Sequence, residues 1–106
     1  MDVVKEQTTY IVTASFIDQD GSAVTPSSGT WRIDDITDGA ITEVQDDTAF
    51  IPSGATHDFE IVPEQQAILV ASHEIEYRLV TVQFTYGAAR KGAAEYKYCI
   101  QNMKGA

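Results

Sequence analysis

The clearest pattern of apolar and polar residues in the chain runs from position 74 to position 86. In its first half Ile75, Tyr77 and Leu79 alternate with charged residues, which is the period-2 pattern of a strand with one buried face. From Val80 onwards the apolar residues occupy the even positions, and Gly87 ends the run. This change of phase predicts a β-bulge at Leu79–Val80, because one inserted residue resets the alternation. The alternative cause is a partner that covers the outer face of the first half of the strand.

Shorter alternating segments before and after this run predict further strands. They span residues 8–17, 30–36, 40–44, 56–62 and 94–101, with turns at 18–21, 37–39, 51–54 and 87–92. The short apolar segment 67–71 fits a brief strand or a turn of helix equally well. Residues 1–7 carry no pattern and are expected to form a flexible N-terminal arm in front of a domain that spans residues 8–106.

No segment repeats apolar residues convincingly at helical spacing, and turn signals recur about every ten residues. The pattern therefore predicts an all-β fold, a single immunoglobulin-like antiparallel β-sandwich of about six to eight strands. Its aromatic core is expected to come from Trp31, Phe59, Tyr77, Phe84 and Tyr98.

Composition and charge narrow the class of protein. The chain has 106 residues, 43% of them hydrophobic, which suits one globular domain. We find no apolar run of bilayer length and no secretory signal, so we expect use in the cytosol or in a particle assembled there. The net charge is −9, with −13 on residues 1–76 and +4 on residues 77–106. Such an acidic chain is expected to bind neither nucleic acid nor an anionic membrane. The uneven charge either steers identical or related subunits together or belongs to two solvated faces.

The sequence offers little catalytic chemistry. Cys99 is the single cysteine, which excludes an internal disulfide and favours a small apolar residue in a strand. The Asp18–Gly21 turn resembles the start of a calcium loop, but Ala23 and Gly29 stand where that loop needs Gly and Glu. The two histidines, His57 and His73, have no spacing that supplies a nucleophile and an orienting group. We therefore expect no enzymatic activity, no cofactor and no metal.

Two groups of charged residues are candidate protein-contact residues. Arg90 and Lys91 lie in the loop 87–92, and Asp34, Asp35 and Asp38 lie in the hairpin at residues 30–45. With Asp46 and Asp47, these acids either bind a divalent cation loosely or form charged rims of an exposed hairpin that block edge-to-edge pairing.

Several runs resemble one family of proteins. Ser15-Phe-Ile-Asp-Gln-Asp-Gly21, Val24-Thr-Pro26 and Thr30-Trp-Arg-Ile-Asp-Asp35 resemble the opening of small immunoglobulin-like proteins encoded among the structural genes of tailed bacteriophages and prophages. The runs Thr81-Val-Gln-Phe-Thr-Tyr-Gly87 and Glu95-Tyr-Lys-Tyr-Cys-Ile-Gln-Asn102 fit the same pattern.

The resemblance implies a virion component: a head-decoration, neck or tail-associated subunit, made in the bacterial host cytoplasm and present in many symmetric copies. Its partners would be other virion proteins and copies of itself, bound through loops, the arm and sheet edges. The family offers no catalytic residues to carry over. The alternatives are a stand-alone immunoglobulin-like module that binds a glycan or host-surface protein, and a small enzyme.

Overall fold

Residues 1–103 fold into seven strands and two short 3₁₀ helices. The structure is a computed structural model, and it describes residues 1–103. The strands are β1 (Asp2–Lys5), β2 (Tyr10–Ser15), β3 (Ser28–Asp35), β4 (Thr42–Phe50), β5 (Thr56–Ile61), β6 (Ile75–Tyr86) and β7 (Arg90–Gln101). The 3₁₀ helices are η1 (Thr37–Gly39) and η2 (Pro63–Gln66). Within this part of the chain, no helix is long and apolar enough to cross a membrane.

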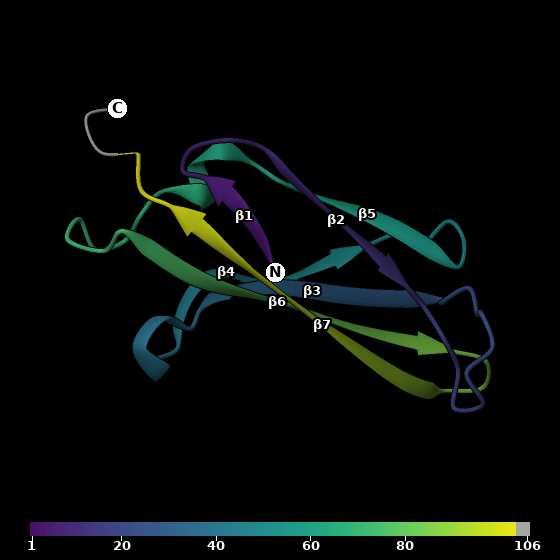
Figure 1. Cartoon of the computed structure of the whole chain (residues 1–106). Coiled ribbons are helices and arrows are strands. Elements are labelled where there is room, and N and C mark those ends of the chain that lie inside the picture. The colour runs from purple at the N-terminus through teal and green to yellow at the C-terminus, as the bar shows by residue number, and fades with distance from the viewer. Residues whose placement is uncertain (104–106) are drawn as a thin grey trace.

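The strands form two sheets, which confirms the all-β class. The large sheet has the order β1-β7-β6-β3-β4, and β2 pairs with β5 in the small sheet. Figure 1 shows β2 and β5 as a layer of their own beside the long strands. This arrangement is compatible with a β-sandwich, whereas its immunoglobulin-like type stays a prediction.

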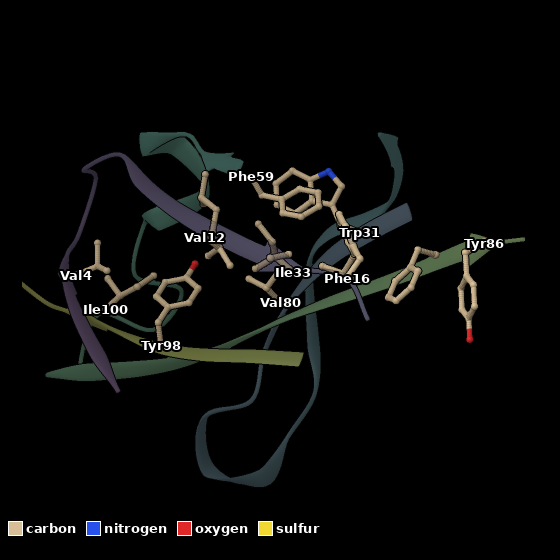
Figure 2. Packing of buried hydrophobic residues seen from close by; sticks show 14 residues of the cluster. Val4, Val12, Phe16, Trp31, Ile33, Phe59, Val80, Tyr86, Tyr98 and Ile100 are labelled. Carbon is tan, nitrogen blue, oxygen red and sulfur yellow. The ribbon is translucent and has the colours of Figure 1, made fainter. Parts of the chain in front are cut away.

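The hydrophobic core lies between the two sheets. The large sheet contributes Trp31, Ile33 and Val80, and the small sheet contributes Val12 and Phe59 (Figure 2). The rings of Trp31 and Phe59 lie 4.9 Å apart, which fixes the sheets against each other through a tilted aromatic contact. Alternate residues of β2 and β5 face the core: Val12, Ala14, Phe59 and Ile61 are buried, and Tyr10 and His57 are half-buried.

The predicted bulge at Leu79–Val80 is wrong. β6 pairs without interruption with β7, from Ile75 opposite Gln101 to Tyr86 opposite Arg90. Even-numbered residues of β6 face the core along its whole length, so Glu76 and Arg78 are fully buried.

The outward set of β6 therefore includes Ile75, Tyr77 and Leu79. Tyr77, expected in the aromatic core, is 43% exposed. The other four aromatic residues of that expectation are buried: Trp31, Phe59, Phe84 and Tyr98.

The structure differs from the expected elements at the N-terminal arm, at the turn between β6 and β7, at residues 67–71 and in β4, which continues to Phe50. Residues 1–7 do not form an unpatterned arm, because β1 pairs in parallel with β7 and Val4 is buried beside Ile100. The turn between β6 and β7 is tight, with positive φ at Gly87 and Ala89, so Arg90 and Lys91 lie in β7 and not in a loop. Residues 67–71 form neither a strand nor a helix.

Candidate functional site

A buried ionic cluster, made of Asp35, His73, Glu76 and Arg78, joins titratable side chains beside the core. Arg78 is fully buried and donates to Asp35 Oδ2 at 2.8 Å and to Glu76 Oε1 at 3.0 Å. It also donates to the backbone carbonyls of Gln65 and Ala67, both at 2.9 Å. The guanidinium thus joins β3 and β6 to the segment that follows β5.

Glu76 is held by an equally complete set of donors. Its carboxylate accepts hydrogen bonds from the N–H groups of Leu69 at 2.8 Å and Val70 at 2.9 Å, and it lies 2.8 Å from His73 Nδ1. Burial raises the pKa of Glu76, but these bonds and the one from Arg78 lower it by more, so the net pKa lies below its ordinary value. The carboxylate is therefore charged at neutral pH, inside the fold.

Strand geometry explains why these residues meet. Glu76 and Arg78 share the core face of β6 with Val80, since alternate residues of a strand point to the same side. Asp35 is the direct cross-strand partner of Arg78 on β3. A carboxylate opposite a guanidinium on the same face can form a close ion pair.

His73 lies at the solvent-facing side of the buried ionic cluster. Its Nε2 is 3.6 Å from Asp38 Oδ2, in the η1 turn, where Asp38 adopts a positive φ. A pocket of about 290 Å³ is lined by these residues and Thr37. Asp35 also accepts a bond from the N–H of Thr37, at 3.1 Å. The carboxylates that line the pocket are thus engaged within the chain, and the cluster serves to bind loop to sheet.

His57 has a different environment. It packs half-buried against the rings of Phe50 and Phe59, with ring centroids 4.9 Å and 4.6 Å away. His57 is thus a half-buried residue of the aromatic packing.

The candidate contact residues fall into two groups. Asp34 and Asp35 are each only 6% exposed, so the expectation that they lie on an exposed charged rim is wrong. The physical reason is ion pairing: Arg32 holds Asp34 through two bonds of 2.9 and 3.0 Å, and Arg78 holds Asp35. Asp38, by contrast, is exposed.

Arg90 and Lys91 are also exposed, at the far end of the large sheet. They pair with Tyr86 and Thr85 of β6, whereas Asp34 and Asp35 pair with Leu79 and Arg78. Their partners on β6 are seven residues apart, which separates the two groups by about 24 Å along the strand, at about 3.4 Å per residue. The structure therefore does not bring the acidic and basic candidates together in one chain.

The outer face of the large sheet carries an apolar patch, on the half of β6 for which a covering partner was the alternative explanation of the change of phase. This outer apolar patch consists of Val3, Ile75, Tyr77, Leu79 and Cys99. Val3, Cys99 and Tyr77 stand opposite one another on β1, β7 and β6. Val3 is 62% exposed and Ile75 is 41% exposed, while Cys99 is buried between its neighbours, as expected for a small apolar strand residue.

The signal that could have revealed the patch is the charge of Glu76 and Arg78 beside Asp35. Opposite charges on facing strands can satisfy one another in the interior, which turns the apolar alternate residues outward. Alternation alone could not give this result.

Metal binding finds no support in this part of the molecule. Among residues 1–103, no three His, Cys, Asp or Glu side chains are grouped so that they could hold a metal ion.

No protein-family model matches the chain, and no curated protein or solved structure is significantly similar to it.

Proposed function

We propose that the protein is a non-enzymatic structural subunit that acts through contacts with other proteins. The observation that carries this proposal is the outer apolar patch, which leaves Val3, Ile75 and Tyr77 in water on the face of a regular sheet. Exposed apolar residues that adjoin one another, unlike scattered ones, are typical of protein-binding surfaces. The side chains of the buried ionic cluster, in contrast, form their hydrogen bonds with one another and with the backbone of the same chain.

We further propose that the assembly is a bacteriophage virion, in which the chain is a head-decoration, neck or tail-associated subunit. The support is the family resemblance in the Ser15–Gly21 turn and the β6–β7 hairpin, together with the strand order. β3, β6 and β7 occupy neighbouring places in one sheet, and β2 pairs with β5 in the other. Immunoglobulin domains arrange their C, F and G strands and their B and E strands in the same way.

The proposal is tested with virions assembled without this protein. Electron microscopy and composition analysis are expected to show missing density, lost components or reduced particle stability. Particles with unchanged composition and stability would contradict the virion role.

Point variants then test the surface. Val3→Ser with Tyr77→Ser is expected to reduce incorporation into particles, because it makes the patch polar. The matched control is Ile41→Ser with Ile51→Ser, which removes two side chains that are more exposed but lie outside the patch. Equal incorporation of both double variants would show that the patch is not the contact surface.

A further inference from the structure

The large sheet ends on one side in an edge that is only partly covered. β7 pairs with β6 over all twelve of its residues, but β1 pairs only with Tyr98–Gln101. Within residues 1–103, the segment 90–97 of β7 therefore has no strand neighbour on its other side. A groove of about 540 Å³ runs beside this edge, between Glu95–Lys97 and β2.

The backbone of this edge is ready to pair. The carbonyl of Gln101 accepts a hydrogen bond from the N–H of Glu6, at 3.0 Å, so it points away from β6. In a strand paired antiparallel on one side, alternate residues point both backbone groups the same way. Lys91, Ala93 and Glu95 thus direct their N–H and C=O groups to the free side, and all three are exposed.

The opposite edge of the sheet is protected in a way that the edge of β7 is not. β4 has register shifts against β3 and carries Glu43, Asp46 and Asp47 without any basic residue. Bulges and charged side chains are the usual means of blocking pairing at a sheet edge. β7 has no bulge, because its ladder with β6 is regular, and its free segment carries charges of both signs, which can pair with those of a partner.

Charge selects a second copy of the chain as the partner and also selects its register. When two β7 edges meet antiparallel about a two-fold axis at Ala93, Lys91 of each copy faces Glu95 of the other. If the second strand slips by two residues toward the C-terminal end of β7, Lys91 faces Lys97 of the other copy. If it slips by four residues, Glu95 faces Glu95. A slip of six restores opposite charges but needs the edge at Cys99, which β1 occupies. Like charges directly opposite each other destabilise a sheet, whereas opposite charges stabilise it.

We propose that two copies of this chain associate through residues 91–95 of β7, antiparallel and with Ala93 at the two-fold axis, so that their large sheets become one continuous sheet. This inference rests on the proposed function, of which it specifies one contact: that of the subunit with itself. Lys91, Ala93 and Glu95 then exchange about six backbone hydrogen bonds with the second copy. Tyr98 of the second copy, where its β1 starts, faces the turn at Ala88, so β1 does not obstruct the pairing.

Sedimentation equilibrium of the purified chain, whose monomer mass is 11.6 kDa, is expected to show a dimer. Lys91→Glu or Glu95→Lys alone turns two opposite-charge pairs into two like-charge pairs and is expected to weaken dimerisation about tenfold or more. The exchange Lys91→Glu with Glu95→Lys in one chain is expected to restore it. Lys97→Glu is the matched control, because it makes the same charge change on the same face of β7 but opposite Ala89.

Ala93→Pro tests the backbone pairing. It removes an N–H that points to the free edge, which an edge strand tolerates, and it is expected to abolish the dimer while the circular dichroism spectrum keeps its β-signature. If this variant does not fold, the charge exchange decides the question by itself.

A chain that remains monomeric at all accessible concentrations would overturn the proposal. So would a dimer that Lys97→Glu weakens as much as Lys91→Glu does, or one that the charge exchange fails to restore. A monomer that still enters virions would refute this edge contact alone, whereas virions indifferent to the protein would refute the proposed function and leave the dimer measurement standing.

Discussion

Replacing Arg78 by Met is expected to lower the free energy of unfolding by about 3–5 kcal/mol, the cost of breaking a buried ion pair from one side. Met fills much of the volume of the arginine stem, so the change removes charge and hydrogen bonds and leaves little cavity. The lost contacts are those to Asp35 at 2.8 Å, to Glu76 at 3.0 Å and to two backbone carbonyls at 2.9 Å.

The size of the loss follows from what remains after the substitution. Asp35 and Glu76 stay buried, and they keep only their other donors, such as the N–H groups of Thr37 and Leu69. Each uncompensated carboxylate is costly in the interior unless it takes up a proton. Because domains of this size are stable by only about 5–15 kcal/mol, the variant loses a large fraction of its stability.

Urea unfolding followed by circular dichroism measures this loss, with Arg32→Met as the matched control. Arg32 also pairs with a carboxylate, that of Asp34, but its side chain is 31% exposed. Water can take the place of the partly exposed guanidinium at Asp34 more easily than in the closed interior around Arg78, so the control is expected to cost clearly less than Arg78→Met, although Asp34 itself is buried. If Arg78→Met costs no more than Arg32→Met, the account of the buried ionic cluster is wrong.

Three further predictions concern pH, close packing and the outer apolar patch. Folding lowers the pKa of Glu76, so its ionised carboxylate stabilises the fold at pH values above the ordinary pKa of a glutamate, near 4.5. This stabilisation is lost as the pH falls through the pKa that Glu76 has in the folded state. The free energy of unfolding is therefore expected to fall less steeply with decreasing pH in Glu76→Gln than in the wild type. Parallel curves for the two proteins would contradict this role of Glu76. Gly92→Ala is expected to cost about 1–3 kcal/mol in urea unfolding, because its Cβ would press on the buried ring of Phe84; Gly54→Ala, in open space, is the control. Tyr77→Ser is expected to change the free energy of unfolding by less than about 1 kcal/mol, since the ring lies on the outer face, and a loss above 3 kcal/mol would show that it belongs to the core.

Local sequence was sufficient to predict most strands and turns. The turn after β2 follows from Asp18, whose Oδ1 accepts bonds from the N–H groups of Asp20 and Ser22, and from Gly21 with its positive φ. Each of these contacts spans at most four residues, so the relevant residue types are adjacent in the sequence. The core positions of β2, β5 and the second half of β6 follow equally well, because there every fully buried residue is apolar.

The arm and Asp35 were harder to predict, because each depends on a distant segment. β1 is a strand only because β7, nearly a hundred residues later, offers an edge to residues 2–5. Asp34 and Asp35 are buried only because Arg32 and Arg78 neutralise them. No local pattern distinguishes such acids from solvated ones.

The first half of β6 shows most clearly where prediction from the local sequence ends and the tertiary structure decides. The sequence by itself determined that residues 75–79 form a strand with one apolar and one charged face. Only the tertiary structure decided that the charged face is the inner one, where Asp35 and the backbone of the 65–70 segment satisfy Arg78 and Glu76. The reason is physical: alternation separates two faces, but which face is buried depends on whether the rest of the fold supplies partners for its charges.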